Sequence, residues 1–260
     1  MSQFSERLRA AVWKAVRRPR RTGRVVLSRL FPVRAMVRDP EAYQAVANWT
    51  FGRAPRVPLT DLFPGVEDVD VTALRAFDRS PHASLSSTEL LALGAIVRLR
   101  RPKRILEVGT FEGNTTLNLA ANAPGDAQII TLDLPPDSAS DLGLAVPEDM
   151  RNKTAKSLVG RQLHNGRGDP RIRQVFGDSA IIDWGNLPGP FDLVFIDGCH
   201  FETYVRSDTR NAITHLAPDG IIIWHDYGII EDVARVVDEV SDRLRVSAIR
   251  GTSLAVATAR

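Results

Sequence analysis

The stretch ILEVGTFEGNTT, residues Ile105–Thr116, decides how the rest of the chain is interpreted. Its first four residues are typical of a buried strand, Gly109 and Gly113 delimit a turn, and a helix-like segment begins at Asn114. A strand that ends in a glycine-rich turn and opens a helix forms a binding site from backbone alone, because the first N–H groups of the helix are unpaired. The stretch therefore predicts a ligand site at the end of a buried strand.

The spacing of the two glycines narrows the choice of ligand. A dinucleotide fingerprint requires Gly-x-Gly-x-x-Gly, whereas these glycines stand four residues apart, with Thr110 and Phe111 in the gap. Glu107, two residues before the first glycine, suits a cationic ligand better than a pyrophosphate. An ordinary strand-to-helix turn would show the same glycines, so the elements that follow must decide between the two interpretations.

The composition is that of an ordinary globular protein. The chain has 260 residues, of which 43% are hydrophobic and 25% are charged. Its one cysteine, Cys199, excludes an intramolecular disulfide and a cysteine-built zinc site, and it agrees with a reducing compartment. No uninterrupted apolar run approaches the about 20 residues that a membrane span requires. We therefore expect a cytoplasmic protein.

The N-terminal residues 1–38 are strongly basic. They hold eleven Lys and Arg residues against one acid, Glu6, whereas the remainder holds 23 basic and 30 acidic residues. Ser5–Val16 has the spacing of a cationic amphipathic helix, so we expect a basic helical arm. It could lie on an anionic membrane surface, bind a polyanion, or pack on the body or on a second subunit; the last is preferred. Because no aromatic residues alternate with the basic ones, we expect no nucleic acid partner.

Beyond the arm, residues 39–86 are a proline-rich connector that resembles a lid, with a short helix expected near Val71–Phe77. In residues 87–260, strands and helices then alternate, which argues for a parallel sheet with right-handed crossovers. The expected strands are 103–108, 127–133, 171–176, 191–197 and 220–225, followed by a hairpin of 245–249 and 253–258; the expected helices are 88–100, 151–164, 201–215 and 230–244. The predicted fold is α/β, a doubly wound, mostly parallel seven-stranded sheet that ends in an antiparallel hairpin.

Acidic residues stand at or just after the ends of the five parallel strands. Ligands of doubly wound sheets bind beyond the carboxyl ends of the strands, so these side chains should meet at one edge. Asp133 lies twenty residues past Gly113, where a carboxylate can accept hydrogen bonds from both hydroxyls of a ribose. The five acids, Glu107, Asp133, Asp178, Asp197 and Asp226, therefore favour a site for a nucleoside-containing ligand.

Glu-x-Gly-x-x-x-Gly and the acids that follow resemble class I S-adenosylmethionine (SAM) methyltransferases. The segments FIDGCHFETYVRSD and LAPDGIIIWHDYG are similar to the branch that contains macrocin O-methyltransferase and cephalosporin hydroxylase-like proteins, and the resemblance covers roughly residues 85–228. It implies a Rossmann-like fold, SAM as cofactor, and methyl transfer to a hydroxyl of a small molecule such as a sugar or natural product. The residues implied to bind SAM are Glu107, Gly109, Thr110, Phe111, Gly113, Asn114, Thr115, Asp133, Leu134, Asp178, Ser179 and Asp197, with Asp178 facing the adenine amino group.

The same resemblance implies a divalent metal and a catalytic base. Asp197, His225 and Asp226 fall on metal positions, although His225 stands where the pattern usually has a second aspartate. Mg²⁺ prefers oxygen ligands, whereas imidazole suits Mn²⁺ better, so the sequence leaves the choice between these two metals open. His225 could instead be no ligand and orient Asp226. His200 follows Asp197 by three residues, where catechol-type enzymes carry a lysine base, and histidine can take a proton from an alcohol. His200 and Asp197 are therefore the predicted catalytic residues. In the alternative interpretation, His200 has no catalytic role and is a residue at the N-terminus of a helix that bonds to backbone.

Two other functions remain compatible with this pattern. One is a metal-dependent, hydroxylase-like enzyme on the same fold, and the other is a non-catalytic SAM- or nucleoside-binding protein that acts through its basic arm. The loop 134–150 and the connector 39–86 are the expected walls of an acceptor pocket. We expect a small-molecule acceptor and a homo-oligomer, and residues 1–38 could also make a peripheral membrane contact.

Overall fold

The structure is a computed structural model, and it describes residues 51–76, 85–136, 142–145, 159–164 and 168–258. The predicted arm 1–38 and the first part of the predicted connector lie outside the described residues. Residues 47–260 form one compact unit that contains every described residue. No helix among the described residues is long and apolar enough to cross a membrane.

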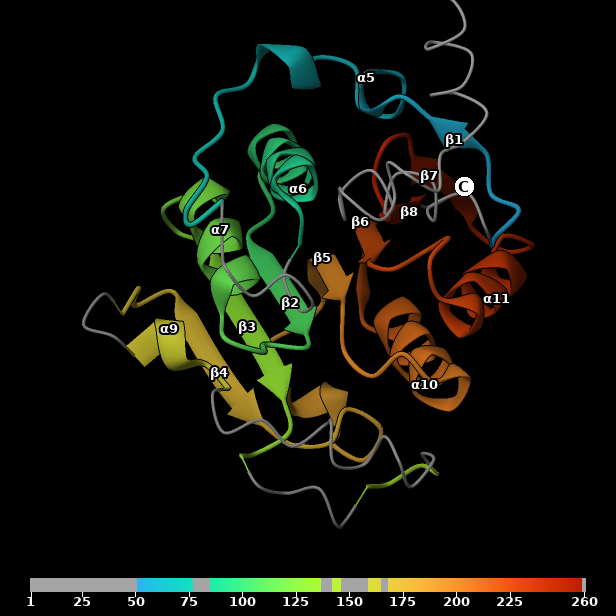
Figure 1. The fold of residues 1–260 in the computed structure, drawn as a ribbon. Coiled ribbons are helices and arrows are strands. Elements are labelled where there is room, and N and C mark those ends of the chain that lie inside the picture. Colours follow the sequence, from blue (N-terminus) through green and yellow to red (C-terminus); the bar gives the residue numbers. More distant parts are fainter. Residues whose placement is uncertain (1–50, 77–84, 137–141, 146–158, 165–167, 259–260) are drawn as a thin grey trace, which may run out of the picture. The chain divides into compact units, whose positions relative to one another are not determined.

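An eight-stranded sheet is the centre of this unit (Figure 1), in the spatial order β1-β7-β8-β6-β5-β2-β3-β4. The strands are β1 (Arg56–Val57), β2 (Arg104–Val108), β3 (Gln128–Asp133), β4 (Ile172–Phe176), β5 (Phe191–Ile196), β6 (Leu216–Trp224), β7 (Arg245–Ile249) and β8 (Ala255–Thr258). Only β8 is antiparallel, pairing with both β6 and β7. The predicted doubly wound sheet with a terminal hairpin is confirmed, and β1, pairing parallel with β7, adds a short strand to the predicted seven.

Four helices cover the two faces of the sheet (Figure 1). The helices are α6 (Ser87–Arg100) and α7 (Asn114–Asn122) on one face, and α10 (Glu202–Thr214) and α11 (Glu231–Val240) on the other. Successive side chains of a strand point to opposite faces of the sheet, so they belong to two separate hydrophobic cores. On β2, Ile105 packs with α6 and α7, and Leu106 packs with α10 and α11. Shorter helices are α5 (Leu59–Leu62), α9 (Arg161–His164) and two 3-10 turns, Val66–Asp68 and Trp184–Asn186.

The chain order places the binding edge of the sheet between β2 and β5. From β2 the chain moves outward to β3 and β4, and it then returns to β5 on the other side of β2. Adjacent strands that lead away in opposite directions leave a crevice at their carboxyl ends, which is where ligands bind in such sheets.

The prediction of a helix near Val71–Phe77 is wrong for residues 71–76, the part of this range that the structure describes. The described residues 71–76 are not helical, because two asparagine side chains of α7 bind their backbone. Asn122 Oδ1 accepts from Thr72 N at 2.9 Å, and Asn118 Oδ1 accepts from Leu74 N at 2.7 Å. The amide groups of both asparagines donate back to the carbonyls of the same two residues. Helical hydrogen bonds are thus replaced by bonds to a neighbouring helix.

Tyr227, just after β6, fixes the segment that leads into β1. Its buried hydroxyl donates to Asp238 Oδ1 at 2.7 Å and accepts from Ala54 N at 2.8 Å. The backbone N–H of Arg53 donates to the same carboxylate of Asp238 at 2.9 Å. Residues 51–57 are therefore anchored beside the loop that carries Asp226, one of the predicted site residues.

Candidate active site

A cavity of about 350 Å³ opens at the carboxyl ends of β2, β3 and β5. The sequence-predicted residues that line it are Gly109, Phe111, Asp133, Leu134, Asp178, Ser179, Asp197 and His200. Glu107, Thr110, Gly113, Asn114, Thr115, His225 and Asp226 are not among the described residues of its lining. The structure thus brings predicted residues from the ends of several strands together around the cavity. The other predicted site residues lie outside its described lining.

The turn after β2 requires its glycines for close packing. Gly109 has φ +101°, and a Cβ there would stand 2.0 Å from the backbone oxygen of Asp197. Gly113 has φ +93° at the start of α7, and a Cβ there would stand 2.7 Å from Leu163 Cγ. Gly109 lets the turn lie directly on the end of β5, so the ligand-facing backbone and Asp197 share one wall of the cavity, whereas Gly113 lets the start of α7 pack against Leu163 of α9.

Asp133 ends β3 on the cavity wall, and backbone groups hold its carboxylate. The N–H of Phe111 donates to Oδ2 at 2.8 Å and the N–H of Leu134 donates to Oδ1 at 2.8 Å. Bonds from two rigid amides fix the orientation of the carboxylate before any ligand arrives. This position fits the predicted role of accepting hydrogen bonds from ribose hydroxyls.

Asp178 lies on the same wall, but its carboxylate is already engaged by the protein. The hydroxyl of Tyr204 and the N–H of Gly143 each donate to Oδ2 at 2.7 Å, and the N–H of Ala180 donates to Oδ1 at 2.8 Å. Asp178 therefore connects β4, the loop at 142–145 and α10. Tyr204, which also lines the cavity, was not among the predicted site residues.

Glu107 lies beneath the turn on the face of the sheet that α7 covers. It is fully buried, and its Oε2 accepts hydrogen bonds from the hydroxyls of Thr116, on α7, and Thr131, on β3. Burial raises its pKa to about 8, against the lowering effect of those two hydrogen bonds. Glu107 thus fastens α7 to the sheet rather than lining the cavity.

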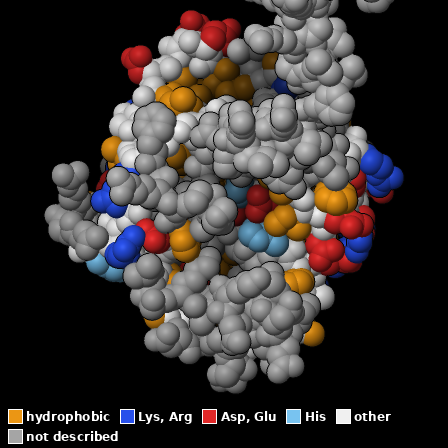
Figure 2. All heavy atoms as spheres, viewed as in Figure 1, with side chains coloured by type: hydrophobic (Ala, Val, Ile, Leu, Met, Phe, Trp, Pro, Cys, Tyr) orange, Lys and Arg blue, Asp and Glu red, His pale blue; other side chains and the backbone are white. Residues whose placement is uncertain are grey.

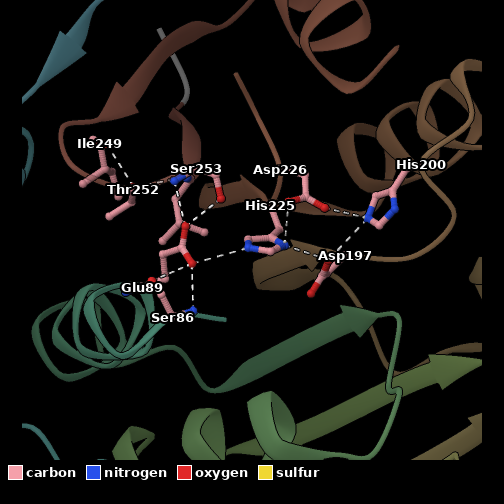
Figure 3. Close-up of polar contacts among 10 residues, drawn as sticks. Ser86, Glu89, Asp197, His200, His225, Asp226, Ile249, Thr252 and Ser253 are labelled. Carbon is pink, nitrogen blue, oxygen red and sulfur yellow. Dashed lines mark hydrogen bonds and ion pairs between the residues drawn. The ribbon is translucent and has the colours of Figure 1, made fainter. Parts of the chain in front are cut away.

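Asp197, His225 and Asp226 form a cluster that could hold a metal ion, with one ligand atom from each within 4.8 Å of the others. His225 Nδ1 lies 3.0 Å from Asp197 Oδ1 and 3.5 Å from Asp226 Oδ1 (Figure 3). Acidic and histidine side chains gather in the middle of the face seen in Figure 2. Two carboxylates and an imidazole are a donor set that a divalent ion such as Mn²⁺ accepts, so the residues fit a metal site.

His200 lies on the other side of the two aspartates, at the cavity (Figure 3). Its Nε2 is 3.1 Å from Asp226 Oδ2 and 3.6 Å from Asp197 Oδ1. Burial opposes charging of both histidines, but the facing carboxylates outweigh it and raise the pKa of His200 and of His225 above the usual value. Burial alone would raise the pKa of Asp197, yet the two imidazoles hold it below its ordinary range.

Comparison with known proteins identifies the family. Residues 106–227 match a family model described as a methyltransferase domain. The match begins in β2 and ends just past Asp226, so it contains Asp197, His200, His225 and Asp226, and every described lining residue of the cavity except Ile230 and Asp232. This match supports the assignment of the chain to the class I SAM-dependent methyltransferases and of SAM as its cofactor.

The relatives of this methyltransferase point to oxygen as the atom that is methylated. A catechol O-methyltransferase of Niastella koreensis is 28% identical over 74% of this chain and 79% of the relative. Catechol O-methyltransferase B of Danio rerio is 29% identical over 45% of this chain and 39% of the relative. Among solved structures, an O-methyltransferase from Bacillus cereus with bound S-adenosylhomocysteine has a TM-score of 0.50 and 17% identity, covering 77% of this chain and 98% of the other. The two sequence relatives support O-methylation rather than a hydroxylase or a non-catalytic binding protein, and the solved structure shows a shared fold.

Proposed function

We propose that this methyltransferase moves the methyl group of SAM to a hydroxyl oxygen of a small molecule, a sugar or natural product, with His200 as general base. The proposal extends to a divalent ion, Mg²⁺ or Mn²⁺, held by Asp197, His225 and Asp226. One observation carries it: His200 and the three metal candidates lie together where β5 and β6 end, and two of them, His200 and Asp197, line the cavity.

The reaction is an in-line displacement. A bond forms between the acceptor oxygen and the methyl carbon, the bond between methyl carbon and sulfur breaks, and its electron pair leaves with S-adenosylhomocysteine. The hydroxyl proton goes to the imidazole of His200. A bound divalent ion would supply a positive charge that makes the hydroxyl more acidic.

The protein's own contribution is mostly positioning. Asp133 is expected to hold the ribose, and the Gly109 turn lets the donor approach the main chain, so that the methyl group is presented toward His200. Holding the two reactants in line can lower the activation free energy by several kcal/mol, and by on the order of 7–11 kcal/mol in the most favourable intramolecular cases. Four of the predicted SAM residues that do not line the cavity, Thr110, Gly113, Asn114 and Thr115, would act indirectly by building the turn and the start of α7.

The test is methyl transfer from labelled SAM to a panel of hydroxylated acceptors. His200→Ala should lower kcat by about 100- to 10,000-fold, the usual contribution of a general base, while the Kd of SAM measured by calorimetry stays the same. His164→Ala is the matched control, since His164 is an exposed histidine on α9 that bonds Gln174. An unchanged kcat in His200→Ala would remove His200 from the role of base.

The metal has a separate test. Treatment with EDTA should abolish turnover, and added Mn²⁺ or Mg²⁺ should restore it, because the ion contributes charge that the protein cannot replace. Undiminished turnover in EDTA would exclude a metal held by Asp197, His225 and Asp226 as part of the reaction.

The cellular setting is also part of the proposal. We place the enzyme in the cytoplasm as a homo-oligomer, with residues 1–38 as a basic arm able to touch a membrane surface, residues 39–86 as a wall of the acceptor pocket, and residues 87–260 as the catalytic domain. The basic charge of the arm supports the membrane contact alone. Sedimentation of the full chain with and without anionic vesicles tests it; a monomer that ignores the vesicles would contradict it.

A further inference from the structure

Glu89, in the first turn of α6, is held rigidly by two distant parts of the chain. Its Oε2 accepts from the N–H of Ser86 at 2.9 Å and from the Ser86 hydroxyl at 2.8 Å, and the N–H of Glu89 donates to Ser86 Oγ at 3.3 Å, which completes the capping box of the helix. Its Oε1 accepts from the N–H of Ser253 at 2.7 Å and from the Ser253 hydroxyl at 2.6 Å. A capping box explains only the first pair of bonds, so Glu89 does more than begin α6.

The imidazole of His225 lies between Glu89 and the aspartate pair (Figure 3). One ring nitrogen, Nδ1, shares a hydrogen bond of 3.0 Å with Asp197 Oδ1 and lies 3.5 Å from Asp226 Oδ1. The other, Nε2, is buried, has no hydrogen-bond partner among the described residues, and lies 3.6 Å from Glu89 Oε2. The two edges of the ring therefore face two different sets of carboxylates.

We propose that Glu89 is a positioning residue for the metal centre: its carboxylate, 3.6 Å from Nε2 of His225, keeps a proton on that nitrogen, so that Nδ1 can exchange its hydrogen bond with Asp197 for an ion held beside Asp197 and Asp226. The inference rests on the metal site of the proposed function. Only a nitrogen without a proton can bind a metal ion, and the hydrogen bond made by the other nitrogen determines which one that is.

The need for such a residue follows from the substitution of imidazole for carboxylate at position 225. A carboxylate has two equivalent oxygens, and either can bind an ion. An imidazole has two inequivalent nitrogens, and without a fixed acceptor behind it the proton could reside on Nδ1 and block the site. Glu89 supplies that acceptor, and Ser86 and Ser253 hold it in place.

The test is the affinity of the full-length protein for Mn²⁺ alone, measured from the electron paramagnetic resonance signal of the free ion. Glu89→Gln should weaken Mn²⁺ binding by about 10- to 100-fold, the usual effect of removing a group that orients a metal ligand. Ser86→Ala is the matched control, because it removes only the hydroxyl bonds of the capping box. The N–H of residue 86 and both groups of Ser253 still hold the Glu89 carboxylate toward His225, so this variant should bind Mn²⁺ as the parent does. Should Glu89→Gln not fold, Glu89→Asp carries the same test, since it withdraws the carboxylate from His225 by one methylene.

A double variant separates positioning from simple stabilisation. In a His225→Asp background there is no imidazole to orient, so adding Glu89→Gln should no longer weaken Mn²⁺ binding. Pulsed resonance should also show coupling between Mn²⁺ and a histidine nitrogen in the parent, reduced coupling in Glu89→Gln, and none in His225→Asp.

Two results would overturn the inference alone. They are an equal loss of affinity in Ser86→Ala and Glu89→Gln, and a Glu89→Gln effect of the same size in the His225→Asp background. Failure of the parent protein to bind Mn²⁺ would remove the metal site and this inference together. Methyl transfer by the parent in the presence of EDTA would show that the O-methyltransferase reaction stands without them.

Discussion

Replacing Glu107 with glutamine should change how the stability of the protein depends on pH. Glu107 is fully buried, and its pKa in the folded state is raised to about 8, mainly by burial. In the unfolded chain a glutamate has a pKa of about 4.3. Between these two values the folded protein keeps the proton that the unfolded chain releases, so stability falls as the pH rises.

The size of the effect follows from the two pKa values. Each pH unit within this window costs up to about 1.4 kcal/mol, so raising the pH from 6.0 to 7.5 should cost about 2 kcal/mol through Glu107. Glutamine keeps an oxygen that can accept from Thr116 and Thr131, as Glu107 Oε2 does, but it does not titrate. The free energy of unfolding of Glu107→Gln should therefore gain about 2 kcal/mol relative to the parent over this interval.

Urea unfolding of both proteins at the two pH values, without SAM and with EDTA, measures this difference. Taking the difference between the proteins cancels the other titrating groups they share. Glu231→Gln is the matched control, because Glu231 is an exposed glutamate on α11, and its difference from the parent should stay flat. A flat difference for Glu107→Gln as well would refute the assignment of Glu107 as a buried, protonated anchor of α7.

Two further predictions concern the packing around the site. Tyr227→Phe leaves the N–H of Ala54 without its acceptor and removes one donor from the Asp238 carboxylate, so unfolding free energy should fall by about 2–4 kcal/mol in urea titrations; a loss below about 1 kcal/mol would contradict the anchor. Gly109→Ala should unfold the protein or abolish SAM binding, because its Cβ would stand 2.0 Å from a backbone oxygen of Asp197 at a φ of +101°. Gly125→Ala, whose Cβ meets nothing within 4 Å, should match the parent in thermal unfolding and calorimetry, and equal behaviour of the two alanine variants would disprove this account of the turn.

The sheet and its binding edge could be predicted because their signals are local. Buried strands appear as short apolar runs, and each parallel strand points its carboxyl end to the same edge, so Asp133 and Asp197 could be placed together without coordinates. The same reasoning failed for one of the predicted site residues, because successive side chains of β2 point to opposite faces of the sheet. Glu107 follows Ile105 by two residues and therefore points toward α7 rather than into the cavity.

Contacts between distant segments could not be predicted from the sequence. Ser86 and Glu89 have the spacing of a capping box, which explains the pair without reference to Ser253, 164 residues away, or to His225. The hydrogen bond from Tyr204 to Asp178 depends in the same way on how α10 packs against the end of β4. Such bonds have no periodic signature, because they are set by the final packing of elements.

The proposed mechanism depends most on whether SAM, the divalent ion and His200 lie together at one rim of the cavity. A crystal structure of the full chain with S-adenosylhomocysteine and Mn²⁺, using anomalous scattering to locate the ion, tests this directly. We expect the ribose hydroxyls on Asp133, the sulfur facing His200, and one manganese peak bound by Asp197, His225 and Asp226. A nucleoside bound away from Asp133, or a manganese peak elsewhere on the protein, would contradict the account.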